Sequence, residues 1–279
     1  GVLQAARRVL RQADIATARL DAELLVAEAL GISRLELYLQ RERLLDAAAL
    51  QRIAGLIRRR ALFEPVAYIL GRKEFYGIDF VISPGVLIPR PESETLVDVV
   101  REKFRPQAPL VFADTCTGSG ILGVTVALYF PRSRGVLLDL SDAVLPVARS
   151  NIRKYQLQNR LDLVRGDLLG SLKPASLDLV LANPPYLATH EIQGTAADVR
   201  EYEPRLALEG GQIGTETPQR LLQEAALVLK PGGVLCFEIG WQQGPWLQEA
   251  MRGGPWERVC CVHDLAGHDR IGVAHLRRC

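Results

Sequence analysis

The sequence predicts an α/β fold in which a mostly parallel, seven-stranded sheet follows a small bundle of helices. Two observations lead to this fold class. Residues 1–70 carry apolar side chains at helical spacing and almost no strand pattern, whereas from Pro109 onward short apolar runs alternate with helical segments. A helix between two such runs returns the chain across the sheet, so successive strands run in the same direction. We therefore expect a helical domain over residues 1–70, a hairpin linker over 71–90 and an α/β domain over 91–279.

Capping residues support the helical domain. Gly31 suits the C-terminal cap of one helix, and Ser33 with Glu36 three residues later fits a capping box at the start of the next. Asp46 is placed to cap the Ala- and Leu-rich segment that ends near Leu62. These helices are expected to pack as a bundle.

The linker and the α/β domain follow in order. Aromatic and β-branched residues over 70–90, interrupted by glycine and proline, predict a short hairpin, and Pro91 suits the first turn of a helix that ends near Phe104. The predicted strands of the sheet are Leu110 to Asp114, Val136 to Asp139, Leu161 to Arg165, Leu177 to Ala182 and Val234 to Ile239, with Val259 to His263 and Ile271 to Leu276 as a terminal pair. The predicted helices are Ile121 to Tyr129, Ser141 to Gln156 and Glu216 to Leu229.

Composition narrows the class of protein. The 279 residues include no apolar run of about 18 or more, and the N-terminus lacks the pattern of a signal peptide, so we expect a cytoplasmic protein with no membrane partner. A net charge of +2 gives no strong reason to expect direct binding to nucleic acid. The five cysteines show no metal-ligand spacing and are expected to be reduced, with no metal bound: Cys116, Cys236, Cys260, Cys261 and Cys279.

The turn after the first predicted strand of the sheet is a candidate cofactor loop. It runs from Asp114 to Gly120, and its glycines at 118 and 120 allow a tight turn and close approach of a ligand to the backbone. The third glycine of the dinucleotide fingerprint is missing at its spacing, which disfavours a nicotinamide cofactor. Asp139 ends the next strand, where a carboxylate can bind ribose hydroxyls, and Asp167 follows the strand after that. Together these positions favour one extended adenosyl ligand.

The fourth predicted strand ends in Asn183-Pro184-Pro185-Tyr186, which we take as the reaction centre. The prolines fix backbone dihedral angles and leave carbonyl groups that only accept hydrogen bonds. A planar nitrogen could donate one hydrogen to the Asn183 side-chain oxygen and another to the Pro184 carbonyl, with Tyr186 covering the planar face. Such an array holds a weakly nucleophilic nitrogen in near-attack geometry. The residues alone leave a carboxamide and an exocyclic base amine both open as substrates.

These motifs together resemble the S-adenosylmethionine (SAM)-dependent amino-methyltransferases. Further segments make the chain similar to the HemK/PrmC-type release-factor glutamine methyltransferases over nearly its whole length. Those segments are Glu74-Phe75-Tyr76-Gly77, Pro84 to Glu92, Glu203-Pro204 with Ala207-Leu208, Gly210-Gly211, and Asp264-Leu265-Ala266-Gly267 with Arg270. Pro91 within Pro89-Arg90-Pro91-Glu92 favours this family over the ribosomal-protein glutamine methyltransferases, which usually carry serine there.

The resemblance implies a Rossmann-like methyltransferase domain and a role for each motif. The segment comprising Cys116, Thr117, Gly118, Ser119 and Gly120 would wrap the methionine part of SAM. Asp139 would hold the ribose, and Asp167 with Leu168 would flank the adenine; Asp114 and Asn183 complete the expected cofactor-binding residues. Asn183, Pro184, Pro185 and Tyr186 would bind the glutamine of the Gly-Gly-Gln loop of a peptide chain release factor, with Asn183, Pro184 and Tyr186 as the catalytic residues. The helical domain would grip the release factor.

Two departures from the family pattern carry their own expectations. Cys116 stands where the family usually has glycine, so its side chain is expected to crowd the methionine end of the cofactor. Ile213-Gly214 stands where the family favours Asp-Gly, which predicts a loop that is less well tied down. Two alternatives remain at this stage: a nucleic-acid adenine or guanine N-methyltransferase, whose substrate amine suits the same acceptors, and a non-catalytic binding module with the methyltransferase fold.

Overall fold

The computed structural model describes residues 1–40, 44–264 and 266–278, which leaves Leu265 and Cys279 outside the described residues. The chain forms two compact units. One comprises Gly1–Arg72 together with Ala196–Tyr202, and the other comprises Lys73–Thr195 together with Glu203–Cys279. In the described part of the chain, no helix has both the length and the apolar character needed to cross a membrane.

The first unit is helical, as expected. Its helices are α1 (Val2–Gln12), α2 (Ala18–Leu30), α3 (Arg34–Leu39), α4 (Ala47–Ala61), α5 (Val66–Leu70) and α9 (Ala197–Tyr202). All three predicted caps are confirmed. Gly31 ends α2 in the left-handed region with φ +65°, Ser33 and Glu36 form the reciprocal capping box of α3, and the Asp46 carboxylate accepts from the Ala49 N–H at the start of α4.

A buried ion pair crosses the apolar core of the helical unit. Arg60 Nε donates to Asp21 Oδ2 at 2.7 Å, and both side chains are 7% exposed. The same guanidinium donates to the carbonyls of Phe63 and Glu64 and reaches Asp198 of α9 at 3.3 Å. Because buried charges need partners, Arg60 links α2 and α4 to a helix that lies far along the chain.

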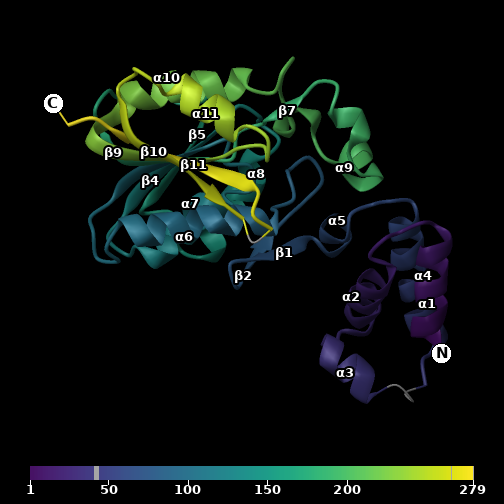
Figure 1. Ribbon diagram of the computed structural model, residues 1–279. Coiled ribbons are helices and arrows are strands. Elements are labelled where there is room, and N and C mark those ends of the chain that lie inside the picture. The colour runs from purple at the N-terminus through teal and green to yellow at the C-terminus, as the bar shows by residue number, and fades with distance from the viewer. Residues whose placement is uncertain (41–43, 265, 279) are drawn as a thin grey trace. The chain divides into compact units, whose positions relative to one another are not determined.

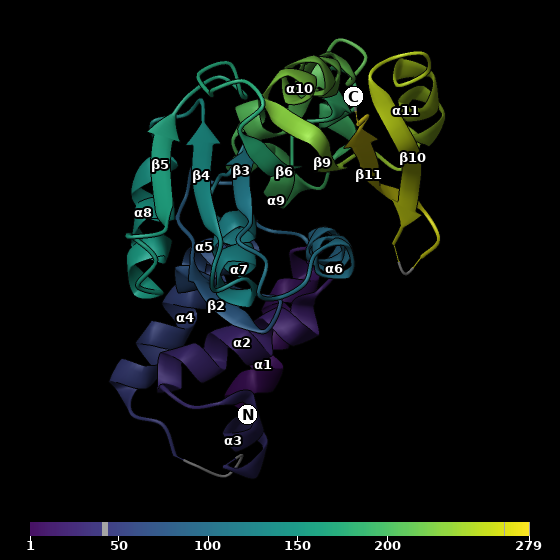
Figure 2. The ribbon, with the colours of Figure 1, turned by 90° about the vertical axis from the view of Figure 1, so that its left-hand side faces the viewer.

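The second unit is built on a seven-stranded sheet with the order β10-β11-β9-β6-β3-β4-β5 (Figure 2). Its strands are β3 (Val111–Thr115), β4 (Arg134–Asp139), β5 (Leu161–Arg165), β6 (Leu177–Ala182), β9 (Leu229–Glu238), β10 (Trp256–His263) and β11 (Asp269–Leu276). The five strands from β9 to β5 are parallel, whereas β11 runs antiparallel to both β9 and β10. The predicted α/β class, the seven strands and the terminal pair are confirmed.

Helices cover both faces of this sheet. The helices are α6 (Glu94–Lys103), α7 (Ile121–Tyr129), α8 (Leu145–Lys154), α10 (Glu216–Val228) and α11 (Gly244–Ala250). Figure 1 shows α6 and α7 on one face and α10 and α11 on the other. The helix α8 begins four residues later than the predicted Ser141, whose N–H donates to the Asp139 side chain in the loop before the helix.

Short elements connect these layers. The predicted hairpin is confirmed as β1 (Arg72–Phe75) and β2 (Ile78–Val81), and its two turn residues, Tyr76 and Gly77, both have positive φ, as a tight two-residue turn requires. The helix predicted from Pro91 opens with a 3-10 turn before α6. This 3-10 turn is η1 (Pro91–Ser93). A two-stranded sheet and two further 3-10 helices were not predicted: β7 (Leu187–Ala188) with β8 (Glu209–Gly211), and η2 (Ile192–Gly194) and η3 (Arg205–Ala207).

Close packing between β3 and β4 depends on one glycine. Gly135 pairs with Phe112 across the two strands, and the Phe112 ring, which is fully buried, lies over the position where a Gly135 side chain would stand. A Cβ atom added at Gly135 would meet the ring at 2.4 Å, far inside van der Waals contact. The aromatic ring therefore fills the space that the glycine leaves in the sheet.

We expect Gly135→Ala to lower the free energy of unfolding by about 1–3 kcal/mol, because the buried ring has no free volume into which it can move. Urea unfolding of the single variants and of the double variant Gly135→Ala with Phe112→Leu measures this. The free energy of unfolding should fall less in the double variant than the sum of the two falls in the single variants, since the smaller side chain removes the clash. Wild-type stability in Gly135→Ala would contradict the packing argument.

Candidate active site

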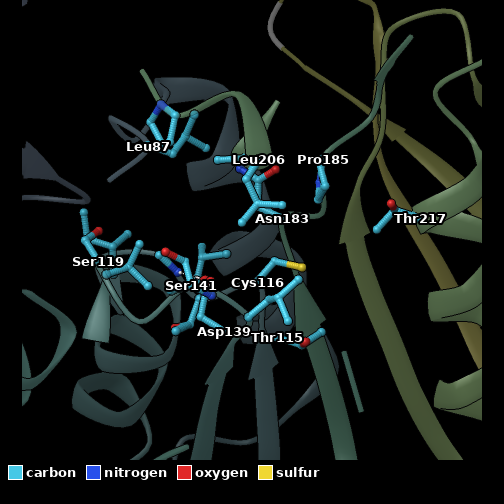
Figure 3. A pocket seen from close by; sticks show the side chains of 18 of the residues that line it. Leu87, Thr115, Cys116, Ser119, Asp139, Ser141, Asn183, Pro185, Leu206 and Thr217 are labelled. Atoms are coloured by element: carbon cyan, nitrogen blue, oxygen red, sulfur yellow. Dashed lines mark hydrogen bonds between the residues drawn. The ribbon is translucent and has the colours of Figure 1, made fainter. Parts of the chain in front are cut away.

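A cavity of about 300 Å³ opens at the carboxyl ends of the parallel strands. Figure 3 shows side chains from several of these strand ends around it. Nine of the predicted site residues line it: Cys116, Thr117, Gly118, Ser119, Asp139, Asp167, Leu168, Asn183 and Pro185. Four other predicted site residues are not among those that line it: Asp114, Gly120, Pro184 and Tyr186. One cavity thus joins the candidate cofactor loop to the candidate reaction centre.

Asp114 is fully buried beneath the cofactor loop. Its Oδ2 accepts hydrogen bonds from Thr117 Oγ1 at 2.6 Å and from the Gly123 N–H at 2.8 Å, so it ties the loop to the first turn of α7. Its Oδ1 has no hydrogen-bond partner among the described residues. Burial outweighs the two hydrogen bonds and raises the pKa of Asp114 to about 7.

The backbone of the cofactor loop turns through three left-handed residues. Gly118 and Gly120 have φ of +53° and +79°, and an added Cβ at Gly120 would press on Ala148 and Leu137 at 3.3 Å. Cys116 adopts φ +55° although it carries a side chain, which costs about 1–2 kcal/mol for an L-residue. Burial and three nearby carboxylates raise the pKa of the Cys116 thiol, so the sulfur faces the cavity as a neutral group.

Asp139 presents a carboxylate at the end of β4. Its Oδ2 accepts from the Gly118 N–H at 2.9 Å and its Oδ1 accepts from the Ser141 N–H at 3.0 Å. Partial burial raises its pKa against these hydrogen bonds. Each carboxylate oxygen has more than one lone pair, so the side chain can still accept from a diol that enters the cavity.

The far end of the cavity combines apolar and charged groups. The carbonyl of Leu168 accepts from Thr115 Oγ1 at 3.1 Å, which fixes the residue that follows Asp167. Arg220 of α10 reaches over to Asp167 Oδ2 at 2.8 Å, and both residues line the cavity. This pair is half exposed, so it contributes little stability and remains available to a ligand.

The reaction centre is held by hydrogen bonds that the motifs did not reveal. Asn183 Nδ2 donates to Ser93 Oγ at 3.3 Å, and Ser93 Oγ donates to Glu238 Oε2 at 2.5 Å. Tyr186 Oη donates to Glu238 Oε1 at 3.0 Å, and burial beside this carboxylate raises the pKa of the tyrosine hydroxyl. The tyrosine hydroxyl is therefore directed toward Glu238.

Sequence reasoning missed several residues of this site. Ser93 and the segment before it line one wall of the cavity, and Pro204, Leu206 and Glu209 line another. Glu203 joins the two walls, because its carboxylate accepts from the Ile88 N–H at 3.0 Å and from Arg90 at 2.5 Å. One signal was available: Glu238 is an acidic residue at the end of β9, as Asp139 is at the end of β4, although the strand predicted here ran one residue further, to Ile239.

The loop over 210–214 is tied down, so the prediction of a loose loop is wrong. The Glu216 carboxylate accepts from the Ile213 and Thr215 N–H groups at 3.1 Å each. Gln243 Nε2 donates to the carbonyls of Gly214 and Tyr186 at 3.1 and 3.0 Å, which joins this loop to the reaction centre. Side chains from α10 and from the start of α11 thus hold this loop.

Of the cysteines, Cys116, Cys236, Cys260 and Cys261 are free thiols, as expected, and Cys279 lies outside the described residues. Across residues 1–40, 44–264 and 266–278, no three His, Cys, Asp or Glu side chains are grouped so that they could hold a metal ion.

Solved structures show which class this fold belongs to. The chain is similar to a methyltransferase from Pyrococcus furiosus with a TM-score of 0.53 and 19% identity, over 82% of this chain and 99% of that one. It is similar to a ribosomal protein L11 methylase from Lactobacillus delbrueckii subsp. bulgaricus with a TM-score of 0.50 and 19% identity, over 68% and 81% of the two chains. Residues 91–200 match the family model of the methyltransferase small domain. The fold and the cavity define a SAM-dependent methyltransferase.

The family follows from closer relatives. Residues 1–71 match the model of the PrmC N-terminal domain. A release factor glutamine methyltransferase of Nitratidesulfovibrio vulgaris is 40% identical over 274 residues, covering 97% of this chain and 92% of the relative. One of Moorella thermoacetica is 41% identical over 260 residues, covering 93% and 92%. The chain belongs to the release factor glutamine methyltransferase family, which confirms the resemblance found in the sequence.

The raised pKa of Asp114 predicts a pH dependence of stability. The ordinary value of an aspartate is about 3.9, so between about pH 4 and pH 7 the folded state holds a proton that the unfolded state has lost. The contribution of Asp114 to stability is therefore complete below this range and falls as pH rises through about 7, by up to about 1.4 kcal/mol per pH unit. Urea unfolding from pH 4 to 8 should show a smaller decline in Asp114→Asn than in the wild type; equal slopes would contradict the assignment.

Cys116→Gly should raise the free energy of unfolding by up to about 1 kcal/mol, because the relief of left-handed strain exceeds the added entropy of the unfolded chain. It should also tighten SAM binding, measured by calorimetric titration, because it removes a side chain from the cavity wall. Gln156→Gly is the matched control, since Gln156 also has a positive φ (+57°) but does not line the cavity. The control should gain stability without a change in SAM affinity; unchanged SAM affinity in Cys116→Gly would refute the expected crowding.

Proposed function

We propose that this protein transfers a methyl group from SAM to the side-chain amide nitrogen of the glutamine in the Gly-Gly-Gln loop of peptide chain release factors, in the cytoplasm. The observation that carries the proposal is the single cavity that Asp139 and Asn183 both line. A cofactor loop and an amide-binding turn must share one space if a methyl group is to pass between them. The names of the relatives supply the identity of the protein substrate.

The chain's own residues fit the proposed cofactor. Asp139 offers free lone pairs to the two ribose hydroxyls, while Leu140, Val144 and Leu168 provide an apolar surface for the adenine. The loop from Cys116 to Gly120 offers close backbone approach to the methionine part, and Asp167 lies where the adenine edge is expected. When bound, SAM supplies an electrophilic methyl group. The neutral thiol of Cys116 leaves that group free of a competing thiolate.

The substrate amide is proposed to bind at Asn183 to Tyr186. A glutamine side chain offers two N–H groups, which the Asn183 Oδ1 and the Pro184 carbonyl can accept, and the two prolines hold these acceptors rigidly. Held in this way, the nitrogen lone pair faces the cavity, and the positive charge that develops on nitrogen is stabilised by the acceptors. The proton that the nitrogen must lose can pass to water, because an N-alkylated amide cation is a strong acid.

We further propose that the helical residues recognise the body of the release factor, with the divisions at 1–70, 71–90 and 91–279 taken from the sequence. Release factor glutamine methyltransferases among the relatives favour a protein glutamine over a nucleic-acid base. The fit of Asp139 and the cofactor loop to SAM favours an enzyme over a non-catalytic module.

Incubation with SAM and a cognate release factor should add a single methyl group to the glutamine of the Gly-Gly-Gln loop, mapped by mass spectrometry. Asn183→Ala should lower kcat by about 100-fold or more, because it removes one of the two acceptors of the amide. Asn159→Ala is the control, since Asn159 is exposed in a turn outside the cavity and should leave the rate unchanged. The proposal fails if the wild type binds SAM but leaves the release factor unmodified, and methylated adenine or guanine instead would favour the nucleic-acid alternative.

A further inference from the structure

Behind the reaction centre lie two buried polar side chains that the proposed reaction does not itself use. Glu238 is 1% exposed and Ser93 is 3% exposed. Their side chains connect Asn183 to Tyr186 in an unbroken series, from Asn183 Nδ2 to Ser93 Oγ, then to Glu238 and on to Tyr186 Oη. Three separate elements contribute to it: the end of β6, the 3-10 turn η1 and the end of β9.

The register between β6 and β9 brings Asn183 and Glu238 close together. Ala182 pairs with Phe237 in the parallel ladder between β6 and β9, so Asn183 and Glu238 are the next residues on neighbouring strands. Ser93 ends the turn that precedes α6 and stands between them. The contact therefore follows from the sheet itself and from the placement of the Pro91 helix start.

Hydrogen-bond direction in this series is determined by the carboxylate. Ser93 Oγ donates to Glu238 Oε2, so the single hydroxyl proton of the serine is used in this hydrogen bond. The Ser93 oxygen is then left with lone pairs only, and it accepts from the Nδ2 group of Asn183. The amide of Asn183 is thereby held in one of its two orientations, with Oδ1 directed away from Ser93 and available to a ligand.

We propose that Ser93 and Glu238 are positioning residues that fix the orientation of the Asn183 amide, so that its oxygen and not its nitrogen meets the substrate. This inference rests on the proposed function. It also explains why a carboxylate is kept in a buried place. Burial raises the pKa of Glu238, although the hydrogen bonds from Ser93 and Tyr186 and the charge of Arg270 lower it. A neutral side chain of the same shape would avoid the cost of removing a charge from water.

Four variants separate positioning from structure. Glu238→Gln keeps the shape but supplies an NH₂ group that can donate to Ser93, which frees the serine proton to reverse the Asn183 amide. Ser93→Ala interrupts the series, and Ser93→Thr keeps the hydroxyl. Ser133→Ala is the matched control, because Ser133 is fully buried and its hydroxyl has no partner among the described residues.

We expect Glu238→Gln and Ser93→Ala to lower kcat for release-factor methylation by about 10- to 100-fold, the range in which a misplaced reactive geometry acts. The KM for SAM should stay at the wild-type value, and the melting temperature should not fall in step with activity. Ser93→Thr should restore most of the rate, and Ser133→Ala should methylate like the wild type. If Ser93 and Glu238 had only a structural role, the variants would lose melting temperature in step with activity, or would lose neither. Either result would overturn the proposal.

A substrate-free measurement keeps this test apart from that of the proposed function. The side-chain Nδ2 protons of Asn183, assigned in ¹⁵N-labelled protein by their absence in Asn183→Asp, should exchange with solvent about 10-fold or more faster in Ser93→Ala than in the wild type. Unchanged exchange would overturn the positioning role even if methylation is normal. A wild type that methylates no release factor but shows this difference in exchange would defeat the proposed function alone.

Discussion

The site depends above all on the register of four parallel strands. Thr115 of β3 pairs with Leu138 of β4 and with Ala182 of β6, and Ala182 pairs in turn with Phe237 of β9. The next residue on each strand is Cys116, Asp139, Asn183 or Glu238, so these four stand in one row across the sheet. A shift of one residue in any ladder would turn that strand's side chains to the opposite face and remove its member from the row. Backbone pairing, and not local loop structure, thus brings the cofactor loop and the reaction centre together.

The two halves of this row suit different ligands. Its β3 and β4 half carries the loop and the strand-terminal aspartate, which suit an adenosyl ligand, and its β6 and β9 half carries the amide and the carboxylate, which suit an amide substrate. Polar side chains hold the segments outside the sheet against it. Asn151 of α8 donates to the carbonyls of Val81 and Ser119, which fixes the hairpin against the cofactor loop. Gln243 does the same for the loop over 210–214.

Much of this could be read from the sequence, because strand periodicity and strand-terminal acids are local signals. The strand Leu161–Arg165, the helix Ile121–Tyr129 and the caps at Gly31, Ser33 and Asp46 were all predicted where they occur. Asp139 and Asn183 were placed in one cavity on the strength of topology alone. What escaped prediction depends on contacts between distant segments. The residues around Ser93 do not predict its contact with Glu238, which lies 145 residues away. Nor do the residues around Tyr186 predict that its hydroxyl is directed toward that carboxylate.

Two buried carboxylates in this sheet, Asp114 and Glu238, lower the stability of the folded protein. Burial raises the pKa of each, so each is less stable as an anion than it would be in water. They lie on either side of the β6 strand that bears Asn183, one holding the cofactor loop and the other holding the amide. A hydrophobic residue at either position would pack at lower cost, but it would leave the loop or the asparagine free to choose between orientations. These two buried carboxylates therefore lower the stability of the sheet, but they hold the acceptors of the reaction centre in one orientation before any ligand binds.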